Sequence, residues 1–90
     1  GSLLYMAPEQ FSDAKNASEK SDIYSLGRIL LELYSGSLSP GTVNYAGVPP
    51  EIEVLVKRCI EPEISRRFST VSDLKKTFHW WMFTGRMRRF

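Results

Sequence analysis

The sequence predicts an all-α fold of three main helices and one short helical turn. Three stretches repeat apolar residues at the spacing of about 3.6 that places them on one face of a helix. Two segments rich in turn-forming residues, 12–20 and 35–50, separate these stretches. With 90 residues, 42% hydrophobic and 24% charged, the chain is too short for two domains and too apolar for a disordered segment. We therefore expect one small domain over residues 1–90.

The short helical turn is expected at residues 8–11, with the sequence Pro-Glu-Gln-Phe. Proline is favoured at the first position of a helix, because the N–H that it lacks would have no partner within the helix there. The turn-forming residues that follow separate it from the first main helix.

The first main helix is expected at about residues 21–34. Ser21 or Asp22 can cap its start, and Gly36 can end it in a left-handed conformation. Leu31 falls off the main apolar stripe, yet the helix is apolar nearly all round, so we expect it to be buried. The stripe consists of Ile23, Leu26, Ile29, Leu30, Leu33 and Tyr34.

The second main helix is expected to open at Pro49 and Pro50 and to end at Pro62. Its apolar stripe consists of Ile52, Leu55, Val56, Cys59 and Ile60. Because Cys59 lies on this stripe, we expect a small core residue and not a nucleophile. A single cysteine also excludes an internal disulfide and makes a cysteine-based metal site improbable.

The third main helix is expected to begin near Ser69 or Thr70, with Asp73 in its first turn, where negative charge is favourable. Its apolar face consists of Val71, Leu74, Phe78, Trp81 and Met82. His79 has no histidine, cysteine or carboxylate at metal-ligand spacing, so we expect a structural or surface role for it.

The positive charge is concentrated late in the chain. The first 45 residues hold three basic and five acidic side chains, and the last 45 hold nine and five. A basic tail at residues 84–90 contains three arginines, Arg86, Arg88 and Arg89. A solvated tail is the simplest interpretation, and nucleic acid is an unlikely partner. Trp80 and Phe83 lie off the apolar stripe, so either they cover the open flank of the core or, with the arginines, they contact a partner protein.

The compartment is expected to be the cytoplasm. No run of about 18 apolar residues exists that could span a membrane. No secretory signal opens the chain, and one cysteine suits a reducing environment.

Three segments carry motifs that point to one family when taken together. Residues 1–9, GSLLYMAPE, are similar to the G-T/S-x-x-Y and A-P-E end of a kinase activation segment. Residues 20–27, KSDIYSLG, are similar to the D-x-x-x-x-G start of the kinase helix F. Residues 59–69, CIEPEISRRFS, are similar to the stretch before the last kinase helix, although Ile64 and Phe68 stand where prolines are usual. The chain thus resembles the C-terminal part of a eukaryotic-like serine/threonine protein kinase domain, which implies a partial C-terminal lobe.

The resemblance implies structural roles for four residues. Glu9 would form a bidentate ion pair with Arg67, a geometry that tolerates partial burial. Asp22 would accept hydrogen bonds from the backbone of a kinase catalytic loop, or it simply caps a helix. Gly27 would let two helices approach closely.

The resemblance also implies a substrate-pocket loop near the start of the chain. Ser2 would take the place of the threonine that touches the catalytic aspartate and lysine in serine/threonine kinases, and its hydroxyl would preserve that chemistry. The loop would consist of Ser2, Leu3, Leu4, Tyr5 and Met6. The alternative is that these residues are part of a small core.

The groups that transfer phosphate do not occur in these 90 residues. Phosphoryl transfer needs a phosphate-binding loop, a lysine on the triphosphate, metal ligands and a catalytic aspartate. The sequence has no G-x-G-x-x-G, no V-A-I-K-like strand, no H-R-D-L-x-x-x-N and no D-F-G. We therefore expect no catalytic residue, metal or cofactor in this chain, with ATP and Mg bound by the parent kinase if complete.

Three functions follow as alternatives. The first is the C-terminal-lobe portion of a serine/threonine kinase, which supplies the pocket loop and scaffold and is inactive alone. The second is a standalone truncated kinase-like protein that binds and regulates another kinase or partner. The third is a small helical interaction or nucleic-acid module whose likeness to kinases is accidental, with Arg86, Arg88 and Arg89 as its contacts. Expected protein partners are the missing kinase portion, another kinase, or a second copy through self-association or domain swapping.

Overall fold

The computed structural model describes residues 4–12, 18–36 and 43–84, and within them it contains helices and turns but no strand. The predicted all-α class is therefore confirmed. The elements are α1 (Glu9–Ser12), α2 (Glu19–Ser35), α3 (Pro50–Cys59), a 3-10 helix η2 (Ile64–Arg66) and α4 (Val71–Thr84). Among the described helices, none is both long enough and apolar enough to span a membrane.

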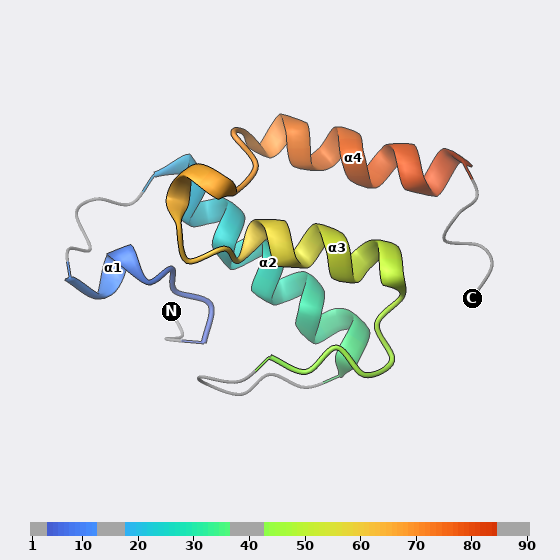
Figure 1. The fold of residues 1–90 in the computed structure, drawn as a ribbon, viewed down its shortest axis with the longest axis horizontal. Helices are drawn as coiled ribbons and strands as arrows, with labels where there is room; N and C mark the ends of the chain where they lie inside the picture. The colour runs from blue at the N-terminus through green and yellow to red at the C-terminus, as the bar shows by residue number, and fades with distance from the viewer. Residues whose placement is uncertain (1–3, 13–17, 37–42, 85–90) are drawn as a thin grey trace.

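The three main helices pack against one another in all three pairings (Figure 1). Helix α3 crosses in front of α2, and α4 runs alongside α3. The short helix α1 lies near the end at which α2 begins. The segment from the end of α3 through η2 returns to this same end, so residues that are far apart in sequence meet there.

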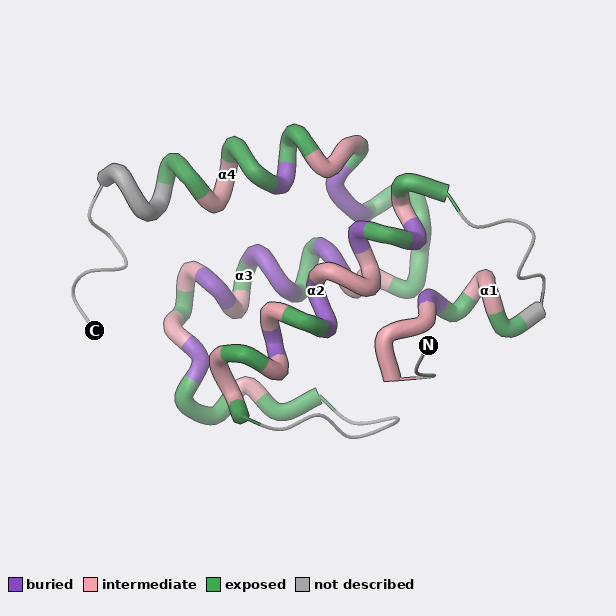
Figure 2. Tube along the Cα trace, turned by 180° about the vertical axis from the view of Figure 1, so that it is seen from behind, coloured by how far each residue is buried: buried purple, intermediate pink, exposed green. Residues whose placement is uncertain are grey.

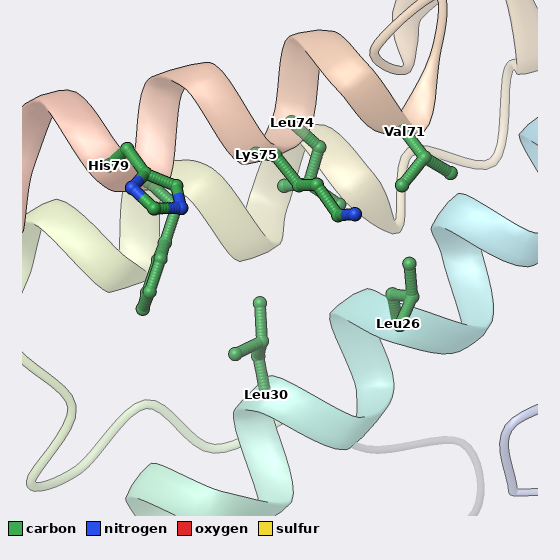
Figure 3. Close-up of a pocket in the computed structure, with 7 residues that line it drawn as sticks. Leu26, Leu30, Val71, Leu74, Lys75 and His79 are labelled. Atoms are coloured by element: carbon green, nitrogen blue, oxygen red, sulfur yellow. The ribbon is translucent and has the colours of Figure 1, made fainter.

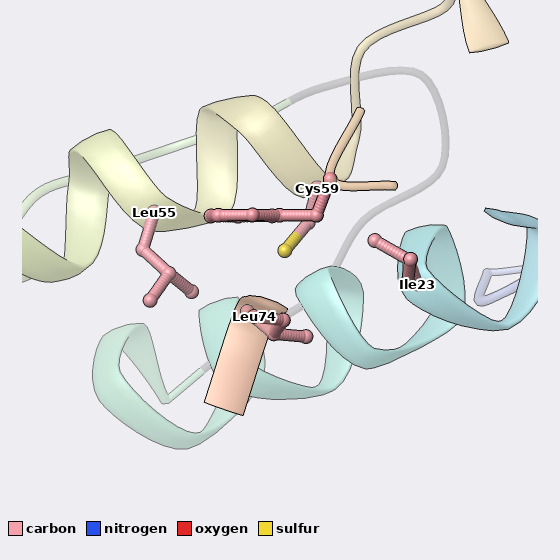
Figure 4. Packing of buried hydrophobic residues seen from close by; sticks show 5 residues of the cluster. Ile23, Leu55, Cys59 and Leu74 are labelled. Atoms are coloured by element: carbon pink, nitrogen blue, oxygen red, sulfur yellow. The ribbon is translucent and has the colours of Figure 1, made fainter. Parts of the chain in front are cut away.

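The core consists of two apolar clusters between these helices. The first contains Ile23, Leu55, Cys59, Phe68 and Leu74, and the second contains Leu31, Val48, Ile52 and Val56. Figure 4 shows side chains of the first cluster pointing toward one another from α2, α3 and α4. Burial raises the pKa of the Cys59 thiol to about 12, as expected for an inert core residue and not for a nucleophile.

Helix α2 begins two residues earlier than predicted, and its cap differs from the prediction. The N-cap is Ser18, whose hydroxyl accepts a hydrogen bond from the Ser21 amide at 3.4 Å. The prediction that Ser21 or Asp22 caps the helix is therefore wrong, because the helical turn already includes Glu19. Ser21 is 1% exposed and its hydroxyl donates to Glu9 Oε2, whereas Asp22 is exposed in the first turn, where the helix dipole favours its charge.

The remaining helix ends follow the predicted signals. Gly36 ends α2 with a φ of 79°, and its amide donates to the Glu32 carbonyl at 2.8 Å. Pro50 is the first residue of α3. At the start of α4, the Thr70 hydroxyl accepts a hydrogen bond from the Asp73 amide at 3.0 Å, which is an N-cap.

The expectation that α2 is buried holds for only part of the helix. Leu31, which the spacing placed off the main stripe, is 2% exposed, whereas Ile29 is 41% and Leu33 is 72% exposed. Helices α3 and α4 both pack against α2, and Ile29 and Leu33 remain exposed among the described residues. Exposed stretches therefore alternate with buried ones along α2 (Figure 2).

Gly27 lies where α2 and α3 approach each other. A Cβ atom on this residue would lie 2.5 Å from the Cys59 Cβ and 2.9 Å from the Ile60 Cγ2. Real Cβ atoms do not approach that closely, so only glycine fits at this crossing. The backbone packing that results brings the middle of α2 against the end of α3.

Candidate functional site

The centre of the candidate site is an ion pair between Glu9, the first residue of α1, and Arg67, which follows η2. The guanidinium binds the carboxylate with two parallel hydrogen bonds: Nη1 to Oε2 at 2.8 Å and Nη2 to Oε1 at 2.9 Å. The Arg67 side chain is 0% exposed, and the Glu9 side chain is 17% exposed. The two residues that the kinase resemblance paired thus lie in bidentate contact, although 58 positions separate them.

Two further donors of Arg67 are also bonded. Its Nε donates to the Glu61 carbonyl at 2.8 Å, and its Nη1 donates to the Lys20 carbonyl at 3.0 Å. The guanidinium carbon lies 5.0 Å from the centre of the Tyr24 ring. Four of the five N–H donors of this buried guanidinium are therefore bonded, and its charge faces a carboxylate, which makes its burial tolerable. Arg67 therefore ties together α1, the first turns of α2 and the segment before α4.

These contacts favour the ionised form of Glu9. Hydrogen bonding to Arg67 is the main reason that the pKa of the Glu9 carboxyl is lowered from 4.5 to about 2. Burial acts in the opposite direction, and the Ser21 hydroxyl, which donates to Oε2 at 2.8 Å, lowers the pKa further. The Glu9 carboxyl is therefore fully ionised near neutral pH.

The described part of the expected substrate-pocket loop lies against α2. Leu4, Tyr5 and Met6 are all half-buried. Two consecutive carbonyls of the loop accept hydrogen bonds from α2: the Leu4 oxygen from Arg28 Nε at 3.0 Å, and the Tyr5 oxygen from the Ser25 hydroxyl at 2.7 Å. The loop backbone is therefore fixed to the helix.

The side chain of Tyr5 is also bonded to α2, because its hydroxyl donates to the Glu32 carboxylate. This bond is the main reason that the pKa of Tyr5 is raised above its usual value. Ser2 and Leu3, the first two residues of the expected loop, lie outside the described residues.

An apolar groove lies between α2 and α4, and its volume is about 310 Å³. In Figure 3, Leu26 and Leu30 rise from α2 toward the α4 side chains Val71 and Leu74 across the open space. The complete lining is Leu26, Leu30, Val71, Leu74, Lys75, Phe78 and His79. His79 is exposed at this groove, in agreement with a surface role.

The expected partner-binding group at the C-terminal end is described only at Trp80, which is 51% exposed. The side chain of Phe83 and the arginines at 86, 88 and 89 lie outside the described residues. Within the described part of the chain, no group of three or more histidine, cysteine, aspartate or glutamate side chains could hold a metal ion.

Sequence reasoning assigned no role to Arg28 or Ser25. Arg28 is 5% exposed, and the signal that could have identified it is a single cation within the otherwise apolar stretch at residues 26–31. Its acceptor is a backbone carbonyl, which no residue type reveals. Phe68, which replaces a usual proline of the motif, is 3% exposed in the core, and the Arg58 guanidinium stacks 4.4 Å from its ring centre.

Comparison with known proteins identifies several protein kinases. The chain is 34% identical over 94 residues to the serine/threonine-protein kinase PknD of Chlamydia muridarum, covering 84% of this chain and 10% of PknD. It is 32% identical over 98 residues to the serine/threonine-protein kinase PknE of Mycobacterium tuberculosis, covering 88% and 17%. It is 34% identical over 88 residues to the RAF proto-oncogene serine/threonine-protein kinase of Xenopus laevis, covering 84% and 13%. No protein-family model matches the chain.

Each alignment includes most of this chain, but the chain spans only 10 to 17% of the length of these relatives.

Proposed function

This chain belongs to the serine/threonine protein kinase family, and from that premise we propose that it forms the C-terminal-lobe part of a kinase catalytic domain. In this role it supplies the substrate-pocket loop and the helical scaffold, and it neither binds ATP nor transfers phosphate by itself.

The Glu9–Arg67 pair is the observation that carries the proposal. It joins the helix that directly follows the pocket loop to the segment before the last helix, at 2.8 and 2.9 Å. The loop is fixed at both ends of its described part, because Arg28 and Ser25 hold its backbone and Ala7, just before α1, is fully buried. A rigid support of this kind is what a peptide-binding loop needs in order to present one shape to its substrate.

The chemistry of transfer is assigned to the remainder of the catalytic domain. None of the phosphate-binding, metal-binding and proton-accepting motifs occurs in the 90 residues, so ATP and Mg²⁺ would be bound by sequence outside this chain. The residues described above orient and support, and none of them is assigned a catalytic step.

A chimeric kinase tests this role. The segment of PknD that matches this chain is replaced by residues 1–90, and transfer of labelled phosphate from ATP to a protein substrate is measured with Mg²⁺. We expect the chimera to retain transfer, and Glu9→Gln to reduce it because the pocket loop loses its support. Glu53→Gln, which breaks only the surface pair with Lys57, is the matched control and should leave transfer unchanged.

A chimera that unfolds cooperatively but transfers no phosphate, while PknD in the same assay does, would contradict the proposed role. Equal activity of the Glu9→Gln and Glu53→Gln chimeras would contradict the part assigned to the ion pair.

A second function, a truncated kinase-like protein that binds another kinase or a partner, is favoured by the exposed apolar surface of α2. Leu33 is 72% exposed and Ile29 is 41% exposed, and the groove beside Leu26 and Leu30 adds to this surface. Contiguous exposed apolar surface is typical of interaction sites. A binder would lower the transfer activity of intact PknD when added in excess, and Ile29→Asn with Leu33→Asn would abolish the effect. No inhibition at any concentration would exclude this second function for PknD-like kinases.

A further inference from the structure

Arg28 is a buried cation in the middle of α2. Arg28 is 5% exposed, and its helix neighbours Gly27 and Leu31 are buried against α3 and the core. Burying a guanidinium is unfavourable, and apolar residues of similar volume often stabilise a fold as well as or better than a buried ion. The presence of an arginine here is therefore not explained by stability alone.

The contacts of Arg28 suggest what it does. Its Nε donates to the Leu4 carbonyl at 3.0 Å, and Ser25, one helical turn earlier, donates to the Tyr5 carbonyl at 2.7 Å. Residues three apart lie on the same helix face, so α2 presents two donors to two consecutive carbonyls. Such bonds fix the path of the backbone, whichever side chains the loop carries.

Arginine suits this task better than lysine. The planar guanidinium holds Nε–H in a fixed direction, whereas a lysine ammonium is a flexible point charge that is more strongly hydrated. The charge also makes the hydrogen bond to a neutral carbonyl stronger than a bond between two uncharged groups.

We propose that Arg28 is a positioning residue that holds the Leu4 carbonyl and so sets the backbone shape of the substrate-pocket loop at residues 4–6. The anchoring of the loop is a property of this chain alone. The consequence for peptide binding rests on the proposed function. Arg28 acts through the loop and does not itself touch the transferred phosphate.

Hydrogen–deuterium exchange of the full chain tests the anchoring. Arg28→Met keeps the volume and removes the donors, and we expect amides in residues 4–11 to exchange about tenfold faster while core amides in α3 keep their rates. Arg28→Lys should give an intermediate rate. Arg58→Met is the matched control, because Arg58 is exposed on α3 and its guanidinium stacks on Phe68, whereas that of Arg28 bonds to the loop, so exchange at residues 4–11 should not change.

An unchanged exchange rate at residues 4–11 in Arg28→Met would overturn the proposal. A uniform increase in exchange rate over the whole chain would also overturn the proposal, because it would show that Arg28 stabilises the whole fold and not the loop in particular.

The PknD chimera then tests the effect on substrate. We expect Arg28→Met to raise the KM for a peptide substrate about fivefold and to leave the KM for ATP unchanged, with partial rescue by Arg28→Lys. Faster exchange at the loop with an unchanged peptide KM would overturn the pocket role. An inactive parent chimera would count against the proposed function, whereas the exchange measurement would still decide whether Arg28 anchors the loop.

Discussion

Replacing Glu9 by glutamine removes the negative charge that faces the buried guanidinium of Arg67. The pKa of Glu9 is lowered from 4.5 to about 2, chiefly by its hydrogen bonds to Arg67. One pKa unit corresponds to about 1.4 kcal/mol, so the ionised carboxylate stabilises the folded chain by about 3 kcal/mol. The stability of a domain of this size is only about 5 to 10 kcal/mol, so the loss would be a large fraction of it.

The direction of the pH dependence follows from the sign of this shift. Because the pKa of Glu9 is lower in the folded chain than in the unfolded chain, its contribution is fully present above pH 4.5. It is lost progressively as the pH falls from 4.5 toward 2, where the carboxylate becomes protonated in the folded chain as well.

Urea denaturation followed by circular dichroism measures this contribution. The free energy of unfolding is determined for the wild-type chain and for Glu9→Gln at several pH values between 7 and 2. The control is Glu53→Gln, because Glu53 pairs with Lys57 at 2.8 Å on the surface of α3 and such pairs contribute about 0.5 kcal/mol or less.

We expect the difference between wild type and Glu9→Gln to be about 3 kcal/mol at neutral pH and to approach zero near pH 2. A difference that is independent of pH, or one no larger than that of Glu53→Gln, would contradict a stabilising ion pair between Glu9 and Arg67.

Three further predictions concern packing and surface. Gly27→Ala should lower the free energy of unfolding by about 2 kcal/mol, because its Cβ would lie 2.5 Å from the Cys59 Cβ; urea denaturation that shows no loss would contradict the close approach. The thiol of Cys59, with its pKa raised to about 12, should react with an alkylating reagent at pH 8 only as fast as the chain opens. Prompt modification of the native chain would count against its burial. Because Leu33 is 72% exposed, the chain should self-associate with rising concentration in sedimentation measurements, and Leu33→Ser should weaken this. Equal association by both chains would assign it to another surface.

Local signals in the sequence were sufficient to predict the helices. The stripe from Ile52 to Cys59 is buried as its spacing indicated, and Gly36 ends α2 as expected. The predicted start of α2 is wrong because Ser18, Ser21 and Asp22 are all residue types that cap helices. Only the extended backbone conformation at Ser18 identifies it as the cap.

The spacing of apolar residues does not show which side of α2 the other helices pack against. The helix is apolar on most of its circumference, so the exposure of Ile29 and Leu33 depends on where α3 and α4 pack, which is a tertiary property. The sequence does contain the polar residues at 25 and 28 that break this apolar surface, but their acceptors are carbonyls of the loop.

The ion pair illustrates a different limit. No rule of spacing brings Glu9 to Arg67 across 58 positions, and the resemblance to kinases supplied that expectation. The further bonds of Arg67, to the carbonyls of Glu61 and Lys20, appear only in the structure.

In the proposed function, this chain supports a kinase pocket while the groups that transfer phosphate lie in other sequence. Incubation of the isolated chain with labelled ATP, Mg²⁺ and a protein substrate, beside the PknD chimera, separates these two parts. We expect incorporation of label by the chimera and none above background by the isolated chain. Incorporation by the isolated chain would contradict the proposed function.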